Sequence, residues 1–271
     1  MYKLIALDMD GTLLNEDKQI SVENHKSLKE AKEQGVKVVL ATGRPLVGIE
    51  NYLKELDLVT TENYSVSFNG ALVQNNNTGE IISKNILNDD DVKYLYDLSL
   101  KLNVNRHANT TDSVITTVNN KYTEIESTIN KIPTHIMDLS NLPSDTEVIK
   151  FMFVDDPSIL DQVINNLPST VYDKYTVVRS APYFLEFLHP MANKGAGVKA
   201  IAERFEINQE EVICVGDAGN DVHMVEYAGL GVAMDNAFDE LKAIANYITK
   251  SNAEDGVAHV VNKFILKKKT A

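Results

Sequence analysis

The sequence predicts an α/β fold in which a parallel sheet, built from both ends of the chain, is interrupted by an inserted domain. Short apolar runs alternate with helical segments near both ends, which is the pattern of βαβ units. Between them strands and helices mix differently, as in α+β domains. We therefore expect a discontinuous, Rossmann-like α/β core of residues 1–82 and 189–271 around an α+β domain of residues 83–188.

The N-terminal part of the core begins with an apolar run at residues 4–7, which is typical of a strand buried on both faces. Ser21 is a suitable N-cap for a helix that runs to Gln34, and Gly35 suits the position just after its end. The pattern then predicts a strand at 36–41, a helix from about Pro45 to Leu56 and a strand at 64–68.

The remaining elements follow from the same signals. An asparagine-rich turn at residues 75–79, between apolar segments 72–74 and 80–82, predicts a hairpin. The inserted domain is expected to hold a helix starting at Asp89, a helix at 156–167, and strands at 114–118, 148–154, 175–178 and 183–188. After the inserted domain the alternation of strands and helices resumes. It predicts helices at 196–205, 221–227, 239–246 and 256–266 and strands at 212–215, 230–233 and 247–249.

The composition excludes several classes of protein. A net charge of −13 argues against nucleic-acid binding, and it requires a local cation at any phosphate site. No apolar run reaches the ~20 residues of a membrane helix, and the N-terminus lacks a signal-peptide pattern. The single cysteine, Cys214, fits a reducing cytoplasm. We expect a cytoplasmic protein without membrane partners, either a monomer or a homodimer, with a solvated tail at Lys267–Lys269.

Four polar clusters follow predicted strands or begin predicted helices. They are Asp8-x-Asp10, Thr42-Gly43, Lys194, and Gly216-Asp217-x-x-Asn220-Asp221. Since the carboxyl ends of parallel strands share one edge of a sheet, these clusters should meet there. Neighbouring carboxylates repel, so they need a cation or a shared proton. Acids, a hydroxyl and a lysine at one edge are what phosphoryl transfer requires.

Each cluster alone has an ordinary structural interpretation. Asp-x-Asp-Gly is often a turn or a calcium loop, although the twelfth position of such a loop is Gln19 and not the expected Glu. Thr42-Gly43 could be a strand-to-helix turn, and Lys194 could lie on the surface. Asp217 and Asp221 could be helix caps. The four clusters together favour a phosphoryl-transfer site.

The four clusters resemble, in order and placement, the motifs of the haloacid dehalogenase-like phosphatases. The first is similar to DxDGT, the second to T-G-R, the third to the lysine and the fourth to GDxxND. The α+β segment between the second and third motifs resembles the cap of the Cof-type branch, and residues 221–234 are similar to that branch as well. The resemblance covers essentially the whole chain, and it implies a phosphatase with a cap that determines specificity.

The resemblance also implies roles for individual residues. Asp8 would be the nucleophile that forms an aspartyl-phosphate, and Asp10 would be the general acid and then the base. Mg²⁺ would be held by the carboxylates of Asp8 and Asp217 and the main-chain carbonyl of Asp10, with Asp221 orienting its waters. The phosphoryl oxygens would be held by Thr42, Lys194, Asn220 and the backbone amides of Met9 and Gly43. Thr12 would support the loop after Asp10, and Arg44 and Asn69 would face the substrate.

The main hypothesis is therefore a magnesium-dependent phosphatase acting on small phosphorylated metabolites, with sugar phosphates as the expected class. A phosphomutase is an alternative, because some capped relatives return the phosphoryl group to the substrate. A non-catalytic phosphometabolite-binding protein is a second alternative, against which the intact Asp8 and Asp10 argue. Asp235 departs from the resemblance, since relatives often have glycine there, and we expect its side chain to point to solvent.

Overall fold

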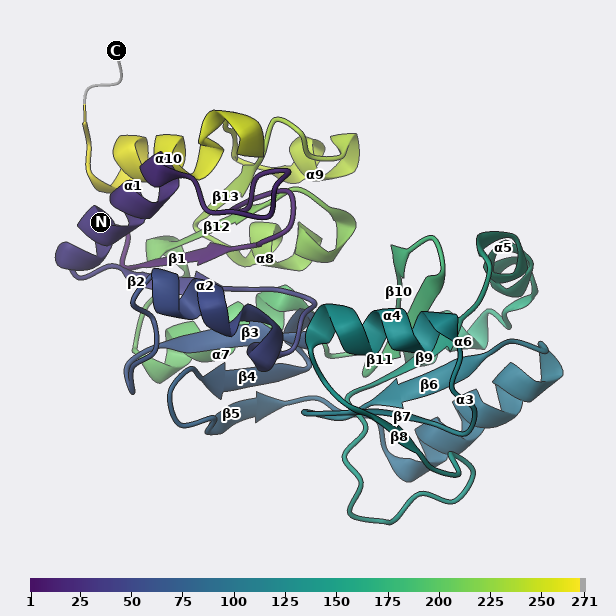
Figure 1. The fold of residues 1–271 in the computed structure, drawn as a ribbon. Helices are drawn as coiled ribbons and strands as arrows, with labels where there is room; N and C mark the ends of the chain where they lie inside the picture. The colour runs from purple at the N-terminus through teal and green to yellow at the C-terminus, as the bar shows by residue number, and fades with distance from the viewer. Residues whose placement is uncertain (269–271) are drawn as a thin grey trace. The chain divides into compact units, whose positions relative to one another are not determined.

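The computed structural model describes residues 1–268, and these form two compact units (Figure 1). The first unit combines Met1–Ser83 with the chain from Asn193 onward, and the second is Lys84–Ala192. Within the described range no helix is both long and apolar enough to cross a membrane. At the expected C-terminal tail, Lys268 forms an ion pair with Glu30, and Lys269 lies outside the described residues.

The first unit is built on a five-stranded parallel sheet to which both ends of the chain contribute. Its strand order is β14-β13-β12-β1-β2, and every neighbouring pair is parallel. The strands are β1 (Leu4–Leu7), β2 (Lys37–Leu40), β12 (Val212–Gly216), β13 (Leu230–Ala233) and β14 (Tyr247–Ile248). All four residues of β1 are completely buried, which explains why this strand is an unbroken apolar run. The predicted α/β class with a parallel core is confirmed.

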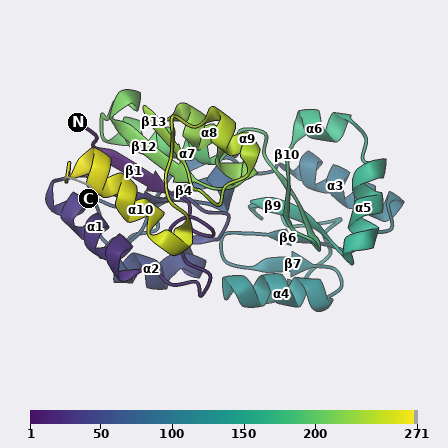
Figure 2. The same ribbon diagram turned by 90° about the horizontal axis from the view of Figure 1, so that it is seen from above.

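Helices cover both faces of this sheet. One hydrophobic cluster joins alternate β1 residues Ile5 and Leu7 to α1 and α10, and another joins Leu4 and Ala6 to α7 and α8. Figure 2 shows α1 and α10 together on one side of the strands. The helices of this unit are α1 (Val22–Glu33), α2 (Glu50–Glu55), α7 (Lys194–Arg204), α8 (Val222–Tyr227), α9 (Asp239–Ile244) and α10 (Gly256–Val260).

The predicted third strand, β3 (Tyr64–Ser67), belongs mainly to a separate three-stranded sheet. Its order is β3-β4-β5, with β4 at Leu72–Asn75 and β5 at Ile81–Lys84, so the predicted hairpin is present. A parallel bridge between Ala41 and Val66 joins β3 to the main sheet. This bridge places the end of β3 next to the loop after β2.

The second unit is a six-stranded sheet with order β10-β11-β9-β6-β7-β8, antiparallel except for the β7–β8 pair. Its strands are β6 (Arg106–Asn109), β7 (Val114–Thr116), β8 (Thr134–Ile136), β9 (Lys150–Val154), β10 (Thr176–Ala181) and β11 (Phe184–Leu188). Its helices are α3 (Asp89–Lys101), α4 (Lys121–Asn130), α5 (Pro157–Asn166) and α6 (Thr170–Lys174). Phe151, Phe153 and Phe187 form the centre of its apolar core.

Four of these elements, β6, β8, α4 and α6, were not predicted from the sequence. The reason is clearest for β6, whose buried side chains include His107 and Asn109. The His107 ring lies 3.1 Å from the Thr123 hydroxyl, and Asn109 donates to Glu126 at 2.9 Å. Partners on α4 therefore engage the His107 ring and the Asn109 NH2 group, polar side chains that would otherwise indicate a loop.

Glu126, the partner of Asn109, also belongs to a buried ion triad. The Lys150 ammonium is 3.1 Å from Glu126 and 3.0 Å from Glu186, and all three side chains are almost completely buried. Burial would lower the pKa of Lys150, but the two carboxylates outweigh this effect and raise it. The triad therefore remains charged, and each carboxylate depends on the single ammonium.

Lys150→Met is expected to lower the free energy of unfolding by about 3 kcal/mol, because it leaves two buried carboxylates without their cation. Urea unfolding followed by circular dichroism measures this change. Lys101→Met, at an exposed position in the last turn of α3, is the matched control and should leave the midpoint almost unchanged. Equal midpoints for both variants would show that the triad contributes no stability.

Candidate active site

The candidate site lies at the carboxyl edge of the parallel sheet. Asp8 follows β1, Thr42 lies just beyond β2, and Asp217 follows β12. The main chain continues the sheet here, since the Asp8 amide donates to the Val215 carbonyl at 3.0 Å. Lys194 is the first residue of α7, whose N-cap Asn193 accepts a hydrogen bond from the Ala196 amide. The structure therefore brings the four sequence clusters to one edge.

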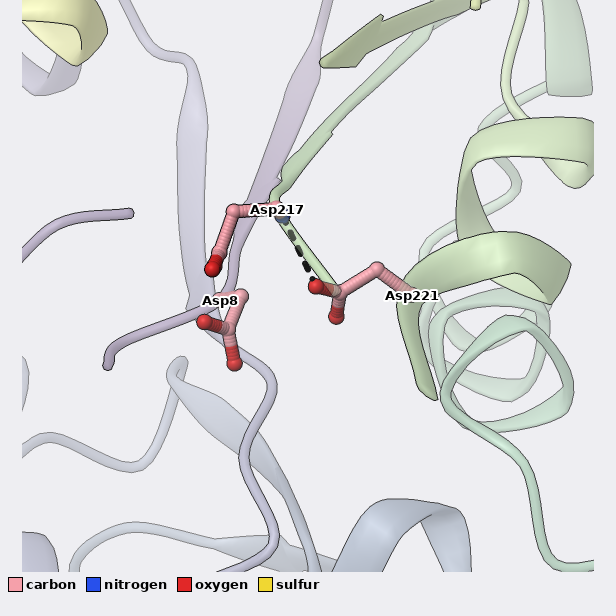
Figure 3. Close-up of side chains that lie close together, drawn as sticks. All are labelled: Asp8, Asp217 and Asp221. Carbon is pink, nitrogen blue, oxygen red and sulfur yellow. Dashed lines mark hydrogen bonds between the residues drawn. The ribbon is translucent and has the colours of Figure 1, made fainter. Parts of the chain in front are cut away.

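Three carboxylates converge at this edge, as Figure 3 shows. Asp8, Asp217 and Asp221 each offer an oxygen within 4.8 Å of the other two. Burial raises the pKa of Asp8 well above its usual value, and the Asp221 and Asp217 carboxylates add to this while Lys194 opposes it. Burial and Asp221 also raise the pKa of Asp217. The site therefore has a deficit of positive charge.

Lys194 supplies part of that charge. Its side chain is completely buried, and its ammonium lies 2.5 Å from Asp8 Oδ1 and 2.7 Å from Asp221 Oδ1. Burial would lower the pKa of Lys194, but Asp221 and Asp8 outweigh it and raise the pKa. One ammonium faces three carboxylates, so it cannot neutralise the cluster alone.

The two oxygens of Asp221 are both engaged by the protein. Oδ1 accepts from Lys194, and Oδ2 accepts from the Ala218 backbone amide at 3.0 Å. Oδ2 also accepts from the Asp217 backbone amide at 2.9 Å, the bond drawn in Figure 3. Gly216 makes this turn possible, because a Cβ there would lie 2.5 Å from the Asp221 side chain. Asp221 thus holds the loop after β12 and the lysine, and leaves Asp8 and Asp217 as the better donors for a cation.

Asp10 makes a separate ion-pair cluster. Arg44 donates through Nε to Oδ2 at 3.0 Å and through Nη2 to Oδ1 at 2.7 Å, and Lys18 donates to Oδ1 at 2.9 Å. Burial would raise the pKa of Asp10, but these two cations outweigh it and lower the pKa. Arg44 was predicted to face the substrate, and in this structure it contacts Asp10. Lys18 was missed, since nothing in its local sequence distinguishes it from a surface lysine.

The residues predicted to bind phosphate lie around the loop after β2. Thr42 is buried, and its hydroxyl accepts from the Arg44 amide at 3.2 Å. Asn220 donates to the Asn69 side chain at 3.0 Å, and a Cβ at Gly43 would lie 3.2 Å from Asn69. Thr42, Gly43, Asn69 and Asn220 therefore form one polar group.

Thr12 is also in contact with the carboxylate cluster. Its hydroxyl donates to Asp217 Oδ1 at 2.8 Å. Met9 lies between Asp8 and Asp10 in the sequence, and its amide was predicted to hold a phosphoryl oxygen. Its side chain is completely buried. Asp235 is exposed, as expected.

The fold and the site together indicate a class of protein, the hydrolases that transfer phosphoryl groups. The parallel α/β sheet carries a buried carboxylate, a buried lysine and further acids at its carboxyl edge. Residues 5–261 match the family model of the haloacid dehalogenase-like hydrolases, and the chain belongs to this family. The resemblance inferred from the four sequence motifs is thereby confirmed.

Two relatives of known sequence are similar over nearly their whole length. The putative phosphatase YxeH of Bacillus subtilis is 46% identical, with 99% of this chain and 100% of the relative covered. The 5-amino-6-(5-phospho-D-ribitylamino)uracil phosphatase YcsE of Bacillus subtilis is 34% identical, with coverage of 97% and 96%.

Solved structures agree with this assignment. A haloacid dehalogenase-like hydrolase from Bacteroides thetaiotaomicron has a TM-score of 0.85 and 34% identity, with 98% of this chain and 100% of that chain covered. The subclass IIB sugar phosphatase BT4131 has a TM-score of 0.78 and 27% identity, with coverage of 97% and 98%.

Proposed function

We propose that this protein is a magnesium-dependent phosphatase that hydrolyses small phosphorylated metabolites through an aspartyl-phosphate on Asp8. The observation that carries the proposal is the buried Asp8 carboxylate, held by Lys194 beside Asp217 at the carboxyl edge of the sheet. The family assignment and the names of the relatives support it, since several are called phosphatases. We expect the protein to act in the cytoplasm.

The donor set suits a hard divalent cation. Asp8 and Asp217 are close together, both have raised pKa values, and Lys194 alone does not neutralise them. We propose that Mg²⁺ is held by these two carboxylates and the main-chain carbonyl of Asp10. Asp221 would not bind the ion directly but would orient its water ligands. When bound, the ion would neutralise charge on the carboxylates and the phosphate.

The proposed reaction has two steps. An oxygen of Asp8 attacks phosphorus, an Asp8–phosphate bond forms, and the bond from phosphorus to the leaving oxygen breaks as Asp10 protonates that oxygen. Asp10 then takes a proton from the water that attacks the aspartyl-phosphate, so that inorganic phosphate is released and Asp8 is regenerated. We propose that Thr42, Asn220, Lys194 and the amides of Met9 and Gly43 hold the phosphoryl oxygens.

Asp10 must be protonated to act as the acid. Its contacts with Arg44 and Lys18 favour the ionised form, so these contacts must loosen before the first step. We propose that a substrate near Arg44 and Asn69 competes for these donors. This competition would couple substrate arrival to the proton transfer.

We propose that the second unit, Lys84–Ala192, is the cap domain and determines the choice of substrate. Sugar phosphates and related phosphorylated polyols are the proposed class, since BT4131 is named a sugar phosphatase and YcsE acts on a phosphoribityl compound by its name. Phosphate release from a panel of phosphorylated metabolites tests this proposal. An isomerised sugar phosphate in place of free phosphate would identify a mutase, and binding without turnover would identify a sensor.

Removal of divalent metal is expected to stop phosphate release, and added Mg²⁺ is expected to restore it. The reason is that the phosphate would otherwise approach a cluster of three carboxylates with a single lysine. Turnover of p-nitrophenyl phosphate after treatment with a chelator, with and without excess Mg²⁺, provides the measurement. Full activity in the chelated protein would contradict the metal site.

A further inference from the structure

Three asparagine side chains bind main-chain carbonyls of the loop that follows Asp8. The pairs are Asn236 with Gly11 at 2.8 Å, Asn252 with Leu14 at 2.9 Å and Asn24 with Leu13 at 3.4 Å. Two of these asparagines are also joined, because the backbone amide of Asn252 donates to Asn236 Oδ1 at 3.0 Å. The C-terminal part of the first unit therefore restrains the loop that carries Asp10.

Asn236 has the most direct connection with the chemistry. Its partner, Gly11, directly follows Asp10 and precedes Thr12, whose hydroxyl binds Asp217. The segment that carries Asn236 also contacts Asp217, since the Phe238 amide donates to the Asp217 carbonyl at 3.0 Å. One short loop after β13 thus binds the turn after Asp10 and the loop that carries a proposed metal ligand.

The turn at Gly11 has little room to adjust. Gly11 has a φ of +89°, in the region that favours glycine, and a Cβ there would lie 2.4 Å from Asp217 Oδ2. The carbonyl of Gly11 belongs to the peptide between Gly11 and Thr12. A donor on this carbonyl therefore restrains the main-chain angles just after Asp10, and with them the direction of the Asp10 side chain.

We propose that Asn236 is a positioning residue that keeps Asp10 aligned with the leaving oxygen of the substrate. This inference rests on the proposed phosphatase function. Asn236 is exposed, and its two side-chain hydrogen bonds, at an exposed position, contribute little to stability. Its effect is on the orientation of the acid, where small displacements change rates strongly.

The test compares two substrates that differ in their need for an acid. A sugar phosphate has a poor leaving group that Asp10 must protonate, whereas p-nitrophenolate leaves without a proton. Asn236→Asp keeps the acceptor for the Asn252 amide but removes the donor to Gly11, and Asn236→Ala removes both without adding charge. In both variants kcat/KM for the sugar phosphate should fall about tenfold, while that for p-nitrophenyl phosphate changes less than about twofold.

Asp235→Ala is the matched control, because Asp235 is the exposed neighbour in the same loop. It should leave both values of kcat/KM and the melting temperature unchanged. Equal losses for both substrates in the Asn236 variants would overturn the inference, because a merely structural effect does not depend on the leaving group. If the unaltered protein released no phosphate from either substrate, the proposed function would fail and the inference with it.

Discussion

Asp8→Asn is expected to reduce phosphate release by at least ~10⁴-fold, because an amide cannot replace the carboxylate as nucleophile. The fold should persist, since asparagine has nearly the same shape and the replacement removes one of three crowded carboxylates. Lys194 would keep its contact with Asp221 at 2.7 Å. The measurement is steady-state turnover of p-nitrophenyl phosphate with Mg²⁺, together with the melting temperature of the variant.

Two comparisons make this result specific. Asp17→Asn alters an exposed carboxylate in the loop beyond Asp10 and should retain full activity. Asp10→Asn should still accept a phosphoryl group from the aryl phosphate but hydrolyse the intermediate slowly, so that mass spectrometry detects the phosphorylated protein. Turnover by Asp8→Asn at the normal rate would exclude Asp8 as the nucleophile.

The core of the site was predictable from sequence because it depends on where strands end. β1 and β12 are buried on both faces and are therefore unbroken apolar runs, so the polar residues that follow them are conspicuous. Parallel neighbours end at the same edge, and the pairing of β1 with β12 brings Asp8 and Asp217 together there.

Side-chain pairing was not predictable in the same way. Asp10 and Arg44 lie 34 positions apart, and their bidentate contact depends on how two loops pack. Asn236 and Gly11 lie 225 positions apart, and asparagine is common in loops that bind nothing. Such contacts are decided by tertiary packing, which leaves no local sequence pattern.

The second unit shows the same limit in the fold. Its apolar strand β9 was predicted, whereas β6 was not, because His107 and Asn109 are buried there with polar partners. Burial lowers the pKa of His107 to about 4, so its ring stays neutral in the sheet at neutral pH. A polar strand of this kind can be identified only when its partners on another element are known.

Lys194→Met is expected to affect stability and activity together. The ammonium is the only side-chain cation described within hydrogen-bonding distance of Asp8, and it also contacts Asp221. Its loss leaves the buried carboxylates of Asp8 and Asp221 without their cation, which should lower the free energy of unfolding by about 3 kcal/mol. Turnover should fall by at least ~10²-fold, because Asp8 would be driven toward its protonated, non-nucleophilic form.

Lys199→Met is the matched control for this prediction. Lys199 lies in the same helix, α7, but is exposed, and its only described partner is Glu203 at 3.8 Å. An ion pair at such an exposed position contributes little, so both stability and turnover should match the unaltered protein. Urea unfolding and p-nitrophenyl phosphate turnover are measured on both variants. If Lys194→Met lost stability but kept its turnover, the lysine would be a structural partner of the carboxylates and would have no part in phosphoryl transfer.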